Sequence, residues 1–318
     1  MTRRTIVRAG FVLLAWLMLL TFPQWSDAWE SSRFAAGIIR QILIFAIFAS
    51  SLNLLVGYVG LPSLGHAAFF GGGAYAAAIA AQRFATDQLA VSLVAGMVGA
   101  ALLALVVGIL AVRANGIFFL MLTLALAQMV FALAYQATDL TGGPNGFSGV
   151  HRPTLFGIDF SAASDLYVLA CVVFLVVVLG LWRITTSSYG RALIGVRENE
   201  RRMRALGYDT RTLKLSAFVL AGVIAGVAGA LSSYEFRFVS PNDVALGTSV
   251  TAFVMVLIGG AGTLVGPVVG AAVVLLIERA LPSQIPAQIV LGALFIVFVV
   301  FARQGIVGAA RGLARARP

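Results

Sequence analysis

Long apolar runs dominate this chain and limit what it can fold into. A helix needs about 20 mostly apolar residues to cross a bilayer, and ten stretches of the sequence approach or exceed that length. Backbone groups inside a bilayer have no water to bond, so such stretches must form helices whose hydrogen bonds are internal. The sequence therefore predicts an all-α, polytopic transmembrane helical bundle, with one membrane domain over residues 1–318.

The predicted spans are Ala9–Trp25, Phe34–Tyr58, Leu61–Ala81, Leu89–Val112, Gly116–Gln136, Leu166–Trp182, Leu213–Ser233, Val244–Gly260, Thr263–Ala280 and Ala287–Ala302. The third span contains Ser63, His66 and the run Gly71-Gly72-Gly73, so we expect it to be broken or re-entrant. Only Ala261-Gly262 joins the eighth span to the ninth, which is short for a crossing turn. Ten spans are therefore the prediction, with eight as the alternative.

Charge is scarce and unevenly placed. Only 11% of the residues are charged and 60% are hydrophobic, whereas soluble domains carry about 25% charged residues, so a soluble enzyme is excluded. If the N-terminus is cytoplasmic and ten spans follow, the inner side receives 16 of the 22 basic residues and three of the 12 acidic ones. Because basic residues gather in cytoplasmic loops, we expect both termini to be cytoplasmic. The net charge of +10 then indicates a lipid bilayer rather than a nucleic acid as the partner.

The first span allows a second interpretation. Its basic start, apolar middle and small-residue end at Ser26-Asp27-Ala28 resemble a signal peptide. The bulky residues Pro23-Gln24-Trp25 stand directly before that point and are unfavourable for cleavage. A retained membrane anchor is therefore the expectation.

The sequence lacks the motifs of a self-sufficient pump or enzyme. It has no GxxxxGK[ST] phosphate-binding loop, so we expect the chain to bind no ATP or other cofactor itself. It has one cysteine, Cys171, and no HExxH, GxSxG or CxxC pattern, so we expect no catalytic residues and no metal site. No Asp or Glu lies in the middle of a predicted span, as proton-coupled carriers usually require.

Five of the polar residues within the predicted spans are candidates for a functional role: Asn53, Ser63, His66, Thr123 and Gln128. Polar side chains are costly in a membrane, where they bond to neighbouring helices or line a solute path. Both interpretations stay open for these five. We expect His66 to be neutral, because no carboxylate lies near it in the sequence.

The longest predicted inner loop, residues 184–212, carries an amphipathic pattern. A mostly apolar stripe recurs at helical spacing, and it consists of Ala192, Val196, Asn199, Met203 and Leu206. Charged residues cover the other faces, and Gly207 is a typical residue just after a helix end. The pattern predicts one short helix on the cytoplasmic face. That helix either rests on anionic lipid or docks a soluble partner.

This loop resembles the ATPase-contacting loop in permeases of branched-chain amino acid ABC importers. The resemblance rests on Gly190-Arg191-Ala192-Leu193, Val196-Arg197-Glu198-Asn199-Glu200, Ala205-Leu206-Gly207 and Lys214-Leu215-Ser216-Ala217-Phe218. Residues 52–60 with 63–70, 122–125 with 140–143, and 259–267 are similar to the same family. Together these stretches span most of the chain from Ser50 to Gly270, and the LivM-type permease is the most similar. Pro62 departs from the polar residue common in the family at that position.

The resemblance implies a set of partners in the bacterial inner (plasma) membrane. They are a second, LivH-type permease subunit, two ATP-binding subunits that use the ATP, and a periplasmic substrate-binding protein. Contact with the ATPase would involve Gly190, Arg191, Val196, Arg197, Glu198, Glu200, Met203, Leu206 and Gly207. The loop at residues 138–164 would face the binding protein, and the five polar residues would border the translocation path.

The function expected from this resemblance is translocation of branched-chain or related small amino acids, without an ATPase site in the chain. Neutral polar residues in the membrane suit an amino acid with no net charge. A second possibility keeps the importer class and changes the cargo to urea, short amides or small carboxylates. A third is an autonomous channel or facilitator, which would need no docking helix.

The charge distribution predicts that residues 197–204 are cytoplasmic and residues 141–151 are extracytoplasmic. Single cysteines at Ser188 and Ser148, in a chain with Cys171 replaced, should react with a membrane-impermeant reagent from opposite sides. Labelling of both positions from the same side would contradict the predicted spans.

Overall fold

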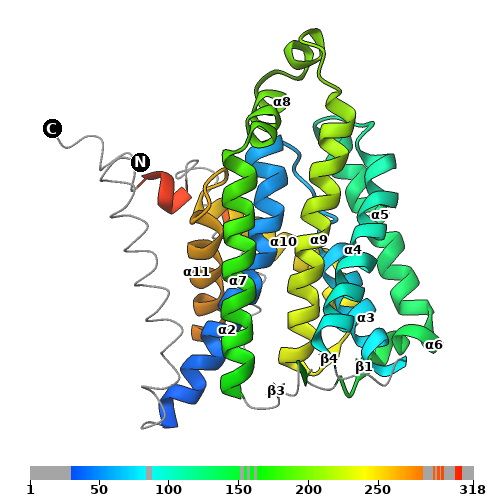
Figure 1. The fold of residues 1–318 in the computed structure, drawn as a ribbon, viewed down its shortest axis with the longest axis vertical. Coiled ribbons are helices and arrows are strands. Elements are labelled where there is room, and N and C mark those ends of the chain that lie inside the picture. The colour runs from blue at the N-terminus through cyan, green and yellow to red at the C-terminus, as the bar shows by residue number, and fades with distance from the viewer. Residues whose placement is uncertain are drawn as a thin grey trace, which may run out of the picture.

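The computed structural model describes residues 30–83, 88–150, 154–155, 158–160, 163–281, 289–290, 292–293, 295–296 and 305–309. These residues form a bundle of helices with short strands at one end (Figure 1). The predicted span Ala9–Trp25 and most of Ala287–Ala302 lie outside the described residues.

The bundle is built from eight of the described helices. They are α2 (Glu30–Asn53), α3 (Ala67–Arg83), α4 (Leu89–Ala111), α5 (Ile117–Gln136), α7 (Ala163–Thr186), α9 (Thr210–Phe236), α10 (Leu246–Gly259) and α11 (Gly266–Ala280). Within the described part of the chain, five helices are long and apolar enough to cross a membrane: α2 with its continuation to Val59, α4, α5, α7 and α9. The chain is thus a multi-pass membrane protein, and the count of ten spans stays a prediction.

The two long loops lie at opposite ends of the bundle. Helix α8 (Ser188–Ala205) projects beyond α7 and α9 at the top of Figure 1. The lower end holds α6 (Thr138–Thr141), the 3-10 turns η2 (Gly143–Asn145) and η3 (Pro241–Asp243), and the strands β1 (Phe147–Ser148), β2 (Thr154–Leu155), β3 (Ile158–Asp159) and β4 (Phe238–Val239). Strand β1 pairs antiparallel with β4, and β2 with β3. Which end is cytoplasmic stays a prediction.

The third predicted span is broken. A π-helix, η1 (Leu54–Val59), continues α2 and ends at Gly60, whose φ of 78° is left-handed. The chain then runs without regular helix until α3 begins at Ala67. Gly65 lies so close to the backbone carbonyl of Thr123 that a methyl group there would overlap it. The interrupted segment is therefore held inside the bundle, where irregular backbone is tolerated at membrane depth.

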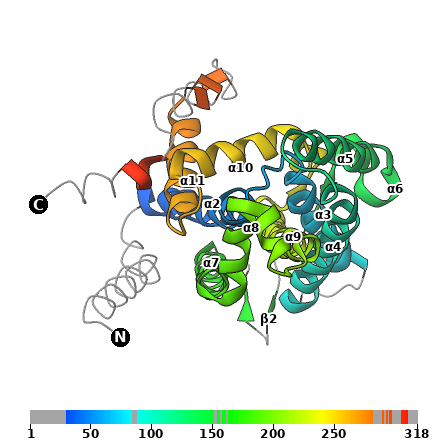
Figure 2. The same ribbon diagram turned by 90° about the horizontal axis from the view of Figure 1, so that it is seen from above.

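Small residues bring α9 close to α3 and α4, as Figure 2 shows from above. A methyl group on Gly226 would overlap Ala100 of α4, and one on Gly229 would overlap the carbonyl of Phe70 in α3. Close backbone approach through small residues is a usual way to join helices in lipid, where no hydrophobic effect drives them together. The three helices form the tightly packed part of the bundle.

One ion pair joins α2 to α9 inside the bundle. The Arg40 guanidinium donates from Nε to one Glu235 carboxylate oxygen at 2.5 Å and from Nη2 to the other at 2.9 Å. Both side chains are buried, with 9% and 5% of their surface exposed. A bidentate pair of this kind gives each buried charge its partner, so an arginine is tolerated inside the second predicted span.

Candidate functional site

Helix α8 consists of two short helices, and the single helix predicted from the sequence is wrong in this respect. Asn199 has an extended backbone, with φ −158° and ψ 93°, in the middle of the element. Its side-chain Oδ1 accepts a hydrogen bond from the Arg202 N–H at 2.9 Å. Asparagine in this conformation is a favourable N-cap, so Asn199 ends the first helix and starts the second.

The apolar stripe of α8 is confirmed at three of its five positions. Ala192, Val196 and Met203 are buried and pack against Leu213 of α9. A methyl group on Gly195 would lie 2.7 Å from the Met203 sulfur, so the absence of a side chain lets the second helix fold back over the first. Asn199 and Leu206, the other two, are exposed, because the break turns them away from the bundle.

Both ends of α8 are fixed by local hydrogen bonds. At the start, the Ser187 hydroxyl accepts from the Gly190 N–H at 3.3 Å, and the Arg191 guanidinium donates to the Thr186 carbonyl at 3.1 Å. At the end, Gly207 has φ 88°, and the Tyr208 N–H bonds to the Met203 carbonyl at 3.1 Å. These bonds form a Schellman motif, so the prediction that Gly207 follows the end of the helix is confirmed.

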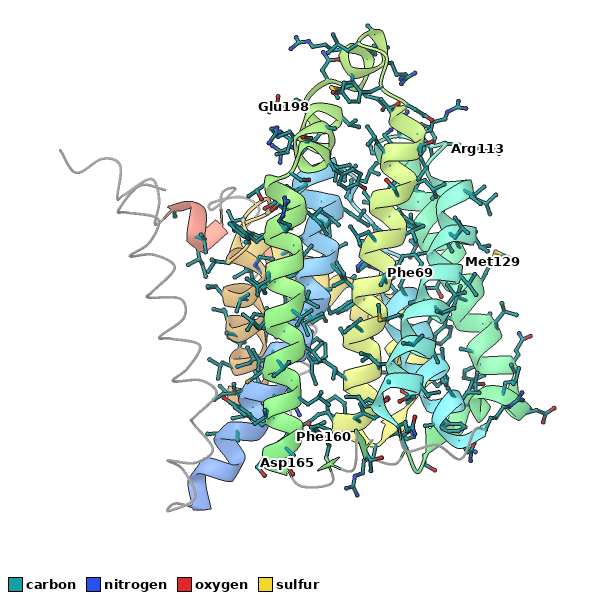
Figure 3. All side chains as sticks on the ribbon, in the orientation of Figure 1. Phe69, Arg113, Met129, Phe160, Asp165 and Glu198 are labelled. Carbon is teal, nitrogen blue, oxygen red and sulfur yellow. The ribbon has the colours of Figure 1, made fainter. Side chains whose placement is uncertain are left out.

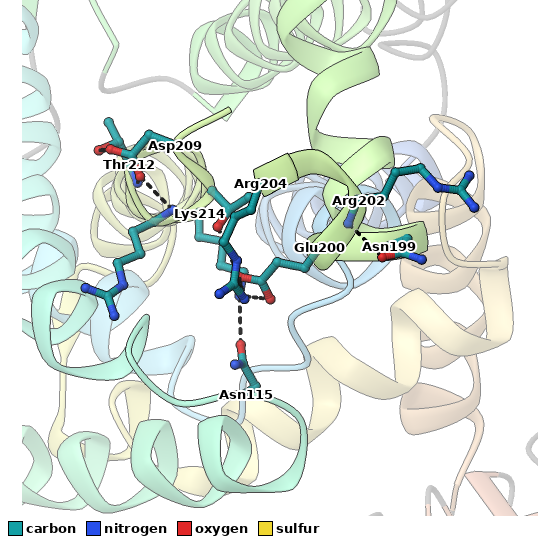
Figure 4. A network of polar contacts seen from close by, with 10 residues as sticks. Asn115, Asn199, Glu200, Arg202, Arg204, Asp209, Thr212 and Lys214 are labelled. Carbon is teal, nitrogen blue, oxygen red and sulfur yellow. Dashed lines mark hydrogen bonds and ion pairs between the residues drawn. The ribbon is translucent and has the colours of Figure 1, made fainter. Parts of the chain in front are cut away.

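A charged network joins the second half of α8 to α9 and to the turn between α4 and α5 (Figure 4). The Lys214 ammonium donates to Glu200 at 2.6 Å and to the Asn115 side-chain oxygen at 2.7 Å. Thr210 donates to the same carboxylate at 3.1 Å, and Arg204 lies 3.3 Å from it. The family resemblance implied that Glu200 contacts the ATPase, whereas the structure ties its carboxylate to Lys214 and Thr210 of the same chain.

The protonation of Glu200 follows from these contacts. Burial alone raises the pKa of the Glu200 carboxyl, but the hydrogen bond and charge of Lys214, with Thr210 and Arg204, outweigh it, and the pKa lies below its ordinary value. A lowered carboxyl pKa means that the network contributes stability at neutral pH and loses it as the pH falls through that pKa. Glu198, by contrast, is exposed, and Figure 3 labels it at the α8 end of the bundle.

Arg197 connects the first half of α8 to the break after α2. Its guanidinium donates to the backbone carbonyl of Gly57 in η1, and Gly60 packs against its aliphatic stem. A π-helical bond to the Gly57 carbonyl would come from position 62, but Pro62 has no N–H. The Leu61 N–H bonds instead to the Leu55 carbonyl at 3.0 Å. Arg197 therefore supplies the donor that the broken helix cannot supply.

Asn53, predicted as a candidate for the path, holds the other side of the same break. Its amide nitrogen donates to the Thr263 carbonyl at 2.9 Å, and its oxygen accepts from the Gly262 N–H at 2.8 Å. A methyl group on Gly57 would overlap Gly262, so η1 lies directly against the turn between α10 and α11. The asparagine joins the end of α2 to the turn between α10 and α11, which favours a role in interhelical hydrogen bonding. We call Arg197, Asn53, η1 and residues 260–265 the junction.

His66 lies deeper and is enclosed. Its Nε2 is 2.8 Å from the Ser51 hydroxyl, which donates its own proton to the Phe48 carbonyl at 2.6 Å. Nε2 must therefore carry the ring proton, and the Nδ1 lone pair has no hydrogen-bond partner in the described structure. The ring of Phe48 stacks on the His66 ring, with 5.7 Å between the ring centroids.

Among described residues, no cluster of His, Cys, Asp and Glu could hold a metal ion.

The remaining path candidates separate into two groups. Ser63 and Thr123 are buried and bond locally, to the Gly65 N–H at 3.3 Å and to the Leu120 carbonyl at 2.9 Å. Gln128 is exposed on the outer face of α5, between Met121 and Met129, which are 59% and 62% exposed. Figure 3 shows Met129 on this outer side. The structure therefore does not bring Gln128 together with the other four.

The sequence was compared with known proteins. The family described as "Branched-chain amino acid transport system / permease component" matches residues 34–300. The high-affinity branched-chain amino acid transport system permease protein LivM of Escherichia coli (strain K12) is 31% identical over 300 residues, covering 86% of this chain and 70% of LivM. LivM of Salmonella typhimurium gives the same values. The autoinducer 2 import system permease protein LsrC of Yersinia pseudotuberculosis is 27% identical over 192 residues, covering 55% of this chain and 52% of LsrC. No solved structure matches.

The contacts of Asn53 and Gln128 predict unequal effects of their substitution on stability. Asn53→Leu leaves the Gly262 N–H and the Thr263 carbonyl unpaired, which should lower the free energy of unfolding by about 1–3 kcal/mol. Gln128→Leu removes an exposed side chain and should change it by less than about 0.5 kcal/mol. Thermal unfolding of the purified chain in detergent compares the two, and equal losses would contradict the assignment of Asn53 to the junction.

Proposed function

The chain belongs to the family of branched-chain amino acid transport permeases and is a permease subunit of an ABC importer. We propose that its cargo is a branched-chain amino acid. We also propose that α8 transmits the movement caused by ATP hydrolysis to the membrane helices. Family membership favours an ABC importer over an autonomous channel or facilitator. The relatives are transport subunits rather than enzymes. The sequence has no phosphate-binding loop, so we assign ATP binding to partner subunits and no cofactor to this chain.

The junction is the observation that carries the coupling proposal. A partner that pulls on α8 would move Arg197, and through the Gly57 carbonyl it would move η1. Asn53 links η1 to the turn between α10 and α11. The Glu200–Lys214 contact gives a second attachment, to α9. Because packed helices shift as rigid bodies rather than deforming, these attachments would turn a displacement of α8 into a tilt of several spans.

The remaining partners follow from the two ends of the bundle. We place the α8 end in the cytoplasm, against two ATP-binding subunits, and the end with α6, β1 and β4 in the periplasm, against a substrate-binding protein. Ten spans with both termini cytoplasmic fit this arrangement, in the bacterial inner membrane. Gly190, Arg191, Val196, Met203 and Gly207 shape and anchor α8, while the exposed Glu198 and Leu206 are free to meet the ATPase.

We assign the exposed face of α5 to a second, LivH-type permease subunit. Large apolar side chains on this face, among them Met121, Met129 and Leu133, are 59–66% exposed. Gln128 lies in the middle of the same face, where an unpaired amide in lipid is costly. A second permease would give that amide a partner and would leave Gln128 at the boundary between the subunits, where a solute could pass.

The coupling proposal predicts a specific defect for Arg197→Gln. The complex should still hydrolyse ATP, because α8 keeps its caps and its apolar contacts, but transport should fall by about tenfold, since one lost charged hydrogen bond is worth about 1.5–3 kcal/mol. Both rates are measured in proteoliposomes with the whole complex. Arg201→Gln, on the exposed side of α8, is the matched control. Normal transport by Arg197→Gln would refute the proposed route.

The subunit boundary predicts where cross-links form. A photoreactive benzoylphenylalanine in place of Gln128 should cross-link this chain to the second permease when the whole complex is irradiated in membranes. The same residue in place of Val176, which is 64% exposed on α7, serves as the control and should give lipid adducts instead. Cross-links to the second permease from position 176 and not from position 128 would place the subunit boundary at α7 instead.

Cargo is proposed from the names of the relatives and from the lack of fixed charge among the candidate path residues. Both LivM proteins are permeases of branched-chain amino acid systems, and none of the five candidate path residues carries a fixed charge. Deletion of the gene should abolish uptake of radiolabelled leucine at low concentration, and excess isoleucine or valine should suppress it in the parent strain. The LsrC match and the urea or amide alternative predict unchanged leucine uptake, which would reject this cargo and keep the permease assignment.

A further inference from the structure

Two neighbouring hollows lie between α4 and α9 at the α8 end of the bundle. One, of about 200 Å³, is lined by Gly108, Ile109, Val112, Leu215, Thr212, Arg113 and Arg211. The other, of about 370 Å³, is more polar and shares Val112, Arg113 and Arg211 with the first. The two arginines therefore stand where an apolar groove meets a polar pocket. Neither hollow belongs to the junction described above.

The groove lies at the level where a membrane surface would be. Ile109 is in the last turn of α4 and Leu215 is in the second turn of α9, and both helices are membrane spans by length and composition. Arg113 follows the end of α4, and Arg211 is in the first turn of α9. Figure 3 shows Arg113 at this end of the bundle, on its outer side. The apolar part of the groove thus faces the lipid chains and the arginines face the headgroups.

The two carboxylates in the hollows are held by other groups, and the charge of Arg211 also acts on the Asp209 carboxyl. Glu200 is occupied by Lys214, Thr210 and Arg204. Asp209 caps α9 by accepting from the N–H groups of Arg211 and Thr212 and from the Thr212 hydroxyl. Over the residues that the structure describes, the guanidinium groups of Arg113 and Arg211 form no hydrogen bond or ion pair. Both side chains are exposed.

We propose that this groove binds an anionic phospholipid, whose phosphate is held by Arg113 and Arg211 and whose acyl chain lies along Ile109, Val112 and Leu215. Guanidinium groups bind phosphate oxygens with paired hydrogen bonds. Basic pockets between spans at a cytoplasmic surface meet the anionic lipids of that leaflet. The groove lies beside the Glu200 network, so a bound lipid would stiffen the base of α8.

The test uses native mass spectrometry of the full chain, purified with the subunits that accompany it, after exchange into short-chain phosphatidylglycerol or phosphatidylcholine. Phosphatidylglycerol should bind and phosphatidylcholine should bind more weakly. Arg113→Gln with Arg211→Gln should weaken phosphatidylglycerol binding by roughly tenfold or more, at about 1 kcal/mol per basic residue. Arg201→Gln with Arg202→Gln removes the same charge from the exposed side of α8 and should leave binding unchanged.

Several outcomes would overturn the proposal. Equal binding of the two lipids would show a groove that does not select an anionic headgroup. Competition by glycerol phosphate as strong as by the lipid would show a site for soluble phosphate. Loss of the ATP-binding subunits from the double variant, with lipid binding intact, would show a protein contact. If the double variant does not assemble, Arg113→Gln alone gives the answer, because the Arg113 side chain has no partner to lose in the described residues.

Discussion

A broken helix inside a membrane must find donors for its carbonyl groups, and this requirement organises the α8 end of the bundle. The break after Val59 leaves the Gly57 carbonyl without a helical donor, since Pro62 has none to give. Arg197, 140 positions further along the chain, supplies it. Asn53, just before the break, is in turn bonded to a turn more than 200 positions away. Satisfying one backbone defect therefore brings together α8, η1 and the turn before α11.

Hydropathy was enough to predict the five described helices that are long and apolar enough to cross a membrane, because apolar runs of that length have one stable form in lipid. Ser63 and His66 also indicated the irregular start of the third span, whereas the glycine run lies within the continuous helix α3. Helix α8 was predicted as one element because the spacing of Ala192, Val196 and Met203 is continuous. The break at Asn199 depends on a side-chain cap and on the lack of a Cβ at Gly195, and helical spacing records neither.

The polar residues show where sequence reasoning stops. Asn53 and Gln128 are both amides within apolar spans, and nothing local distinguishes them. Their fates differ because the partners of Asn53 lie on a distant turn, whereas the face of α5 that carries Gln128 meets none of the described helices. The apolar residues of α5 lie on all of its faces, so hydropathy does not reveal which face is packed against other helices. The same holds for Lys214, whose partners Glu200 and Asn115 lie on separate elements.

The Arg40–Glu235 pair also bears on how the protein is made. Arg40 leaves the ribosome 195 residues before its partner, an interval of roughly 10 to 40 s at ordinary rates of synthesis. During that time its long side chain can reach the headgroup layer and keep its charge hydrated. The pair with Glu235 can form only after α9 has been made. The contact between α2 and α9 is therefore completed late in synthesis, when most of the chain has left the ribosome.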